Sequence, residues 1–198
     1  MTKNVEKTKK LTVTSLLAAL VVIVSFLPLK TLGLEISFAM VPVAVGAIVL
    51  GPLTGAILGG VFGAVSFLQC FGYSAFGALV LSESFIGAFL MCFPTRVLAG
   101  FLTGVIYKAI AKSGDKVALI LSSIISPLLN TVFFMSALVL IFYNGETIQG
   151  FVKTLGAANP FSFVILFVGI NGLLEIIAGF IVTYPVSAAL KKRFGKIH

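Results

Sequence analysis

Residues 84–108 read SFIGAFLMCFPTRVLAGFLTGVIYK, and this stretch decides the fold. As an α-helix it would extend about 37 Å, which is more than the ~30 Å hydrocarbon core of a bilayer. Arg96 is its only charged residue before Lys108 at the end. The stretch therefore predicts a transmembrane helix that carries one arginine inside the membrane.

The rest of the chain has the same character. Of its 198 residues 59% are hydrophobic and 10% charged, and the mean hydropathy is +1.18. A soluble domain has about 25% charged residues, so this chain cannot form the charged surface of a soluble globule. The composition predicts an all-α integral membrane protein with a single membrane domain over residues 1–198.

Apolar runs separated by short polar breaks predict a bundle of six transmembrane helices. Their expected ranges are 11–29, 36–51, 52–71, 84–108, 117–143 and 161–190. The second and third runs are divided at Leu50-Gly51-Pro52, where the proline suits a helix start. The first run is longer than the apolar part of a secretory signal, so we expect it to be retained as a helix.

The basic residues predict how the helices are oriented. With both termini in the cytoplasm, eleven of the fourteen Lys and Arg residues face the cytoplasm, Lys30 and Lys153 face outward, and Arg96 lies within a span. An odd number of spans would place one basic terminus outside. The net charge of +8 therefore indicates orientation and contact with anionic lipid head groups, and we expect no nucleic-acid binding.

The composition also argues against an enzyme. The only histidine is His198 and the only aspartate is Asp115, in a predicted cytoplasmic turn. These counts exclude Ser-His-Asp, Cys-His and paired-aspartate sites, and the sequence has no P-loop motif for ATP. Cys70 and Cys92 lie alone in apolar runs, so we interpret them as core residues and expect no catalytic residue, cofactor or metal.

Glycine spacing predicts how the helices pack. Glycines recur every four residues at Gly51, Gly55, Gly59 and Gly63. Small residues at this spacing allow two helix backbones to approach closely. Gly100 and Gly104 follow Arg96 by four and eight residues, so Arg96 should share their face and point into the protein.

Arg96 has two interpretations. An arginine at this depth costs at least about 2.5–3.5 kcal/mol on insertion scales, so it needs compensation. It could form an internal ion pair with Glu175, the only acidic residue within a predicted span. Alternatively, its planar guanidinium could bind an anionic group of a substrate. Both apply if the substrate competes with Glu175.

Other polar residues are expected at the depth of Arg96. Asn171 and Glu175 lie one turn apart on the last predicted helix, and Asn130 lies near the middle of the fifth. Gln69, at the outer end of the third helix, could cover them. Singly, such residues join helices more often than they bind ligands. Their convergence predicts a substrate-binding site.

Several segments resemble one known family. They are ISF at 36–38 with Val41-Pro42, GAIVLGPLTG at 46–55, PTRVLAG at 94–100, PLLNT at 127–131 and GINGLLE at 169–175. Over essentially its whole length, the chain resembles the substrate-binding S components of energy-coupling factor vitamin transporters. The last three segments resemble the branch that takes pantothenate.

The resemblance implies a transport subunit in a prokaryotic plasma membrane. Such a subunit captures a vitamin from outside and docks onto a transmembrane coupling protein that carries two cytoplasmic ATPases. By this resemblance, Arg96 would bind the carboxylate of pantothenate, Asn130 and Asn171 its amide or hydroxyls, and Glu175 a hydroxyl. The segment 28–37 resembles the family's substrate lid.

The family's docking motif, A-x-x-x-A in the first helix, is altered in this sequence. The corresponding small pairs are Thr14 with Ala18 and Ser15 with Ala19. Serine and threonine are still small enough for close helix packing, so we expect the coupling protein to dock on these residues.

Three alternatives stay open from the sequence. The chain could be an S component for another vitamin, riboflavin foremost. It could be a solitary channel or ion-coupled permease. It could also be a membrane scaffold in which the pair of Arg96 and Glu175 is purely structural.

Overall fold

The computed structural model describes residues 2–27, 30–31, 34–35 and 38–194, without the side chains of residues 2–3, 30–31, 34–35, 170–171 and 194. The helices are α1 (Thr2–Ser25), α2 (Met40–Leu50), α3 (Pro52–Gln69), α4 (Ala75–Glu83), α5 (Phe85–Ala111), α6 (Asp115–Phe142), α7 (Glu146–Leu155) and α8 (Pro160–Phe194). Between α1 and α2 lie two antiparallel strands of two residues each, β1 (Lys30–Thr31) and β2 (Leu34–Glu35). The predicted all-α class is confirmed.

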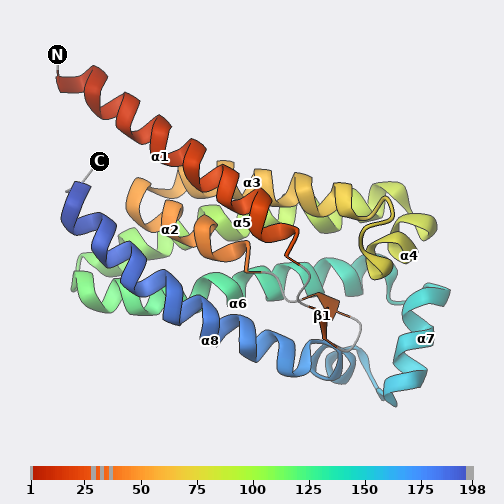
Figure 1. Cartoon of the computed structure of the whole chain (residues 1–198). Coiled ribbons are helices and arrows are strands. Elements are labelled where there is room, and N and C mark those ends of the chain that lie inside the picture. Colours follow the sequence, from red (N-terminus) through yellow and green to blue (C-terminus); the bar gives the residue numbers. More distant parts are fainter. Residues whose placement is uncertain (1, 28–29, 32–33, 36–37, 195–198) are drawn as a thin grey trace.

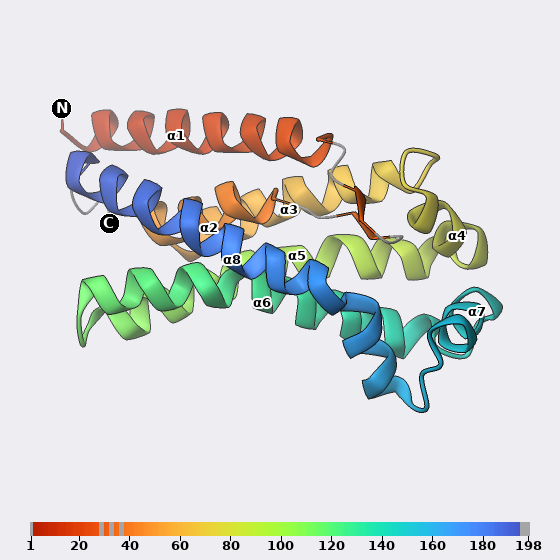
Figure 2. The same cartoon turned by 60° about the horizontal axis from the view of Figure 1, so that its bottom comes forward.

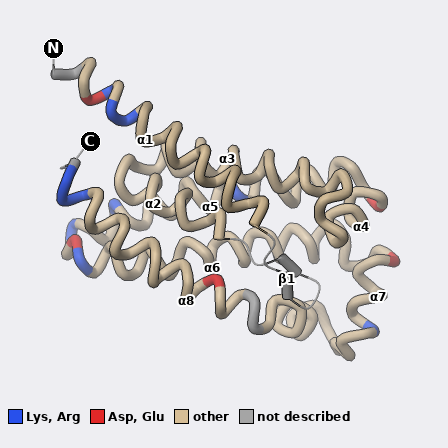
Figure 3. Tube along the Cα trace, viewed as in Figure 1, with Lys and Arg blue, Asp and Glu red and all other residues tan. Residues whose placement is uncertain are grey.

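The long helices lie side by side in an elongated bundle (Figures 1 and 2). The N-terminal end of α1, the C-terminal end of α8 and the α5–α6 turn lie at one end, while α4 and α7 lie at the other. Most Lys and Arg residues gather at the end with the termini, which we call the basic end (Figure 3). The described ends of α1 and α8 therefore lie at the same end of the bundle.

Five helical segments in the described part of the chain are long and apolar enough to cross a membrane. They are Asn4–Ser25, Pro52–Gln69, Phe85–Ala111, Asp115–Phe142 and Gly172–Arg193. A sixth span is obtained only if Glu146–Leu155 and Pro160–Gly169, which are bent by 75° at their junction, count as one. The segments 72–83 and 144–160, which separate the third from the fourth and the fifth from the sixth predicted span, contain the short helices α4 and α7.

The second predicted span, 36–51, differs from the structure. Of its residues, 36–37 lie outside the described part, and α2 has 11 residues, which reach only about 16 Å. Almost all of α2 is buried, because it packs against α1, α3, α5, α6 and α8. Its apolar composition therefore reflects contact with other helices, and hydropathy alone does not separate this case from contact with lipid.

A tight turn joins α2 to α3. Gly51 has φ 100° and ψ 174°, a backbone conformation that favours glycine, and Pro52 begins α3. The Gly51 amide donates to the carbonyl of Ala47 and closes the end of α2. The break predicted at this position is confirmed.

Glycines bring α3 and α5 into close contact. A Cβ at Gly55 would lie 2.3 Å from the carbonyl oxygen of Gly100, and one at Gly59 would lie 2.2 Å from that of Arg96. A Cβ at Gly63 would lie 2.8 Å from the Cα of Phe93. The close packing predicted from the four-residue spacing is confirmed, and the backbone of Arg96 is held directly against α3.

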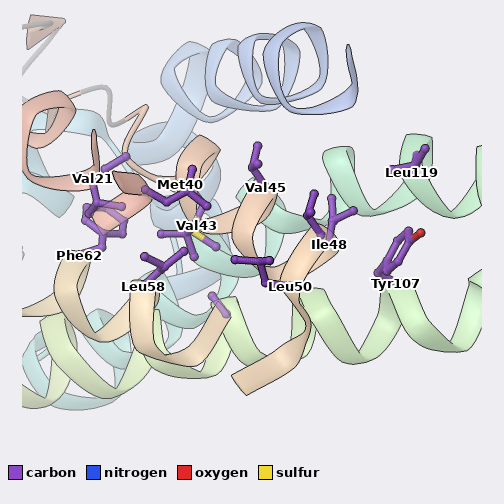
Figure 4. Packing of buried hydrophobic residues seen from close by; sticks show 14 of the residues in the cluster. Val21, Met40, Val43, Val45, Ile48, Leu50, Leu58, Phe62, Tyr107 and Leu119 are labelled. Carbon is purple, nitrogen blue, oxygen red and sulfur yellow. The ribbon is translucent and has the colours of Figure 1, made fainter. Parts of the chain in front are cut away.

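The main hydrophobic core surrounds α2 (Figure 4). Val43 and Ile48 of α2 are almost fully buried against Val21 of α1, Leu58 of α3 and Leu119 of α6. Burial of this kind contributes about 1.5–3 kcal/mol per side chain to the stability of the fold. The core fixes α3, α5 and α6 relative to one another, and these helices carry the site described below.

A polar contact joins three helices at the basic end. Lys191 of α8 donates to Asp115 of α6 and to the hydroxyl of Tyr107 of α5, which in turn donates to Asp115. The Lys191 Nζ also lies 4.8 Å from the centroid of the Tyr107 ring. This contact ties the end of α8 to the α5–α6 turn.

Candidate binding site

The Arg96 guanidinium bonds carbonyls of the preceding turn of α5, in the part of the helix that contains Pro94. Pro94 has no N–H, which weakens the hydrogen-bond ladder in this part of α5. Two side chains bond the carbonyls of the preceding turn: the Thr95 hydroxyl donates to Met91 O at 2.5 Å, and Arg96 Nη1 donates to Cys92 O at 3.1 Å and to Met91 O at 3.3 Å. The guanidinium is therefore folded back toward the N-terminal end of α5.

Two aromatic rings lie against this guanidinium. Its Cζ is 4.8 Å from the ring centroid of Phe62 on α3 and 4.9 Å from that of Phe134 on α6. Arg96 is only 7% exposed, and its Nε has no hydrogen-bond partner among the described residues. Cation–π contacts stabilise the buried charge, while the Nε–H donor has no partner in the described part of the chain.

Asn130 is placed on the same side of α6 as Phe134. The two residues are one helical turn apart, so they share a face. Asn130 is buried, and its Oδ1 has no hydrogen-bond partner within the described part of the chain. A buried acceptor without a partner costs about 1–3 kcal/mol, which a bound ligand would recover.

Glu175 reaches the same level from α8. Gly179 packs on α6, because a Cβ there would lie 3.0 Å from Cγ of Pro127. Since α6 and α8 run in opposite directions (Figure 1), Glu175, one turn before Gly179, lies about level with Asn130. The opposite charges of Glu175 and Arg96 attract each other at this depth, although this effect on the guanidinium is small compared with that of its burial. Arg96 and Asn130 are both buried, and Glu175 lies on α8 at about the level of Asn130; that the three residues form one site stays a prediction.

The last predicted helix is broken just before these residues. Gly169 has φ 41° and ψ −131°, which interrupts α8, so the expected single span 161–190 differs from the structure at this point. The spanning part begins at Gly172. The side chain of Asn171 lies outside the described part, so its role stays a prediction. The two glycines at 169 and 172 were the available signal for the break.

Gln69 makes a contact between helices in this structure. Its Nε2 donates to the carbonyl of Ser25 at 2.7 Å, which ties the end of α3 to the end of α1. Gln69 is buried at the end of α3, as its position in the sequence suggested. Its role above the site stays a prediction.

The predicted docking residues divide between two faces of α1. Thr14 and Ala18 are partly buried, and the Thr14 hydroxyl donates to Lys10 O of its own helix. Ser15 and Ala19 are exposed. Since α1 enters the core through Leu17 and Val21, the face with Ser15 and Ala19 is open along the helix.

Sequence reasoning missed Phe62 and Phe134. The chain has 19 phenylalanines, and residue type alone does not separate these two from the others. The one available signal was that Phe134 follows Asn130 by four residues. Among the described residues, no group of three or more His, Cys, Asp or Glu could hold a metal ion.

The fold and the site define a helical membrane protein with a polar, partly unsatisfied site buried between its helices. The family described as ECF (energy-coupling factor) transporter, substrate-specific component has a sequence model that matches residues 9–187. The chain belongs to this family, so it is a transport subunit of the prokaryotic cell membrane and not an enzyme. Comparison with curated proteins gives no match.

Proposed function

We propose that this chain is the S component that captures pantothenate for an ATP-driven importer. The observation that carries the proposal is the buried guanidinium of Arg96, which the rings of Phe62 and Phe134 hold with Nε unpartnered. A carboxylate supplies the acceptors that a guanidinium takes up best. Pantothenate combines one carboxylate with an amide and two hydroxyls.

The other polar groups suit the rest of this molecule. Asn130 Oδ1, which is buried and unpartnered, can accept from the amide N–H or a hydroxyl of the ligand. Glu175 can accept from a hydroxyl. We assign Asn171 to the amide or hydroxyls and Gln69 to the outer edge of the site, both from the sequence resemblance.

Riboflavin fits this site less well. It is neutral, so it would leave a desolvated arginine without an anionic partner. Biotin and folate carry carboxylates, so they belong in the same binding screen as competitors.

We further propose that the basic end faces the cytoplasm, since positive residues favour that side. The coupling protein would then dock along α1, on the face that includes Ser15 and Ala19, and two ATPases bound to the coupling protein would supply the energy. A family member of this kind needs no nucleotide site of its own.

Calorimetry on the purified protein tests the proposed ligand. Wild type is expected to bind pantothenate with submicromolar affinity, and Arg96→Ala to lose at least about 100-fold, because a buried charge-assisted pair disappears. Lys153→Ala is the matched control, since it removes one positive charge from the exposed side of α7. Binding by Arg96→Ala at the wild-type level, or co-purification of a yellow flavin, would overturn the assignment.

A further inference from the structure

Two cysteines meet where α3 ends against α5. Cys70 directly follows α3, and Cys92 lies in α5 one turn before Arg96. Their Sγ atoms are 3.9 Å apart, and both residues are buried, at 3% and 1% exposure. The sequence suggested two separate core residues; the fold brings the chain's only two cysteines into contact.

Ser66 holds both sulfurs in place. Its hydroxyl donates to Cys92 Sγ at 3.8 Å, and its carbonyl accepts from Cys70 Sγ at 3.4 Å. A hydrogen bond donated to sulfur supports the thiolate, which is the reactive form of cysteine. A Cβ at Gly77 of α4 would lie 2.9 Å from Cys70 Sγ, so the glycine leaves room for this sulfur.

We propose that Cys70 and Cys92 form a redox-active dithiol that a peroxide closes into a disulfide between α3 and α5. The Cys92 sulfur attacks one oxygen of hydrogen peroxide, and the O–O bond breaks. One water departs, and Cys92 becomes a sulfenic acid. The Cys70 sulfur then attacks the Cys92 sulfur, the S–O bond breaks, and a second water departs. The two thiols lose two electrons and two protons, and hydrogen peroxide is reduced to two waters.

The two sulfurs have only a short distance to close. A disulfide has its sulfurs about 2.05 Å apart, so the two Sγ atoms approach by about 1.9 Å from their present separation. Rotation of the two side chains about χ1 moves a sulfur on this scale. The helix backbones stay in contact through the glycines of α3.

The dithiol adjoins the candidate site. The carbonyl of Cys92 accepts from Arg96 Nη1 at 3.1 Å, and Ser66 lies one turn from Phe62 on α3. A bridge at Cys92 is therefore anchored in the turn of α5 whose carbonyls orient the guanidinium, and we expect it to shift that orientation. This consequence rests on the proposed function, because it concerns ligand affinity; formation of the disulfide does not.

Thiol counting on the full-length protein in detergent tests the disulfide. After hydrogen peroxide, the denatured wild type is expected to have lost ~2 Da and to carry no thiol that maleimide labels, and dithiothreitol should restore both thiols. Cys70→Ser and Cys92→Ser should form no internal bridge, and Ser66→Ala should close at least threefold more slowly. Two labelled thiols, mass gains in steps of ~16 Da, or disulfide-linked dimers on a non-reducing gel would overturn the proposal.

Calorimetry with pantothenate tests the link to the site. The oxidised protein is expected to bind at least fivefold more weakly than the reduced protein, and dithiothreitol should restore the affinity. Equal affinities would overturn the link. Failure of the reduced protein to bind pantothenate would instead overturn the proposed function, and the thiol count is independent of that result.

Discussion

Arg96 shows how a membrane protein can hold a charge ready for a ligand. Its guanidinium is compensated by two backbone carbonyls, by the rings of Phe62 and Phe134, and by the charge of Glu175. The carbonyls and rings fix its position without using every N–H donor. A ligand carboxylate would therefore meet an arginine that is already oriented, which reduces the entropy lost on binding.

The ring of Phe134 should contribute to affinity through this orientation. Phe134→Leu removes the ring and keeps an apolar side chain, and we expect pantothenate to bind about 3- to 30-fold more weakly, a loss that approaches the strength of a desolvated cation–π contact. Calorimetry measures the effect. Phe89→Leu is the control, because Phe89 is an exposed aromatic residue of α5. Equal losses in both variants would mean that the ring of Phe134 has no special role.

Glu175 should act in the opposite direction to Arg96. Its carboxylate attracts the guanidinium in the empty protein and would repel the ligand's carboxylate. Glu175→Gln keeps the size and an acceptor for a hydroxyl, so we expect two- to tenfold tighter binding of pantothenate, corresponding to about 0.4–1.4 kcal/mol. A calorimetric titration of this variant and of wild type shows whether pantothenate binds more tightly or more weakly. Weaker binding would mean that the negative charge itself is needed.

At the scale of elements, the spacing of small residues predicted more than hydropathy did. The four-residue repeat of glycines located the contact of α3 with α5, because small residues at this spacing allow two helix backbones to approach closely. Hydropathy predicted that α2 spans the membrane, because apolar side chains are favoured both in contact with other helices and in contact with lipid. It also ran through Gly169, because a glycine is not polar enough to interrupt an apolar run in a hydropathy average. The approach of Phe62 and Phe134 to Arg96 depends on packing between distant segments, which no local pattern records.

The α3–α5 contact allows a matched test with two adjacent glycines. A Cβ at Gly59 would lie 2.2 Å from a backbone oxygen of α5, whereas one at Gly60 meets nothing closer than 3.7 Å. Gly59→Ala should therefore separate the helices and cost about 1–3 kcal/mol, and Gly60→Ala should be neutral or slightly stabilising. Thermal unfolding in detergent compares them; equal midpoints would show that the contact tolerates a methyl group.

At the scale of the whole molecule, the candidate site and the proposed docking face lie on different parts of the bundle. The candidate site lies between α3, α5, α6 and α8, whereas α1 is largely exposed and touches the core through few residues such as Leu17 and Val21. Lys191, Asp115 and Tyr107 hold α5, α6 and α8 together at the basic end without α1. A partner could therefore cover α1 without direct contact with the site.

This separation predicts a variant that binds but does not transport. Ala19→Trp places a large ring on the exposed face of α1, where close helix packing needs small residues, so we expect uptake of labelled pantothenate by cells to fall at least about tenfold. The affinity of the purified variant should stay within about twofold of wild type, because the helices of the site are untouched. Ile57→Trp, at an exposed position of α3, is the control and should keep both activities. Parallel loss of affinity and uptake in Ala19→Trp would show that α1 supports the site itself, whereas normal uptake would place the coupling protein on another face.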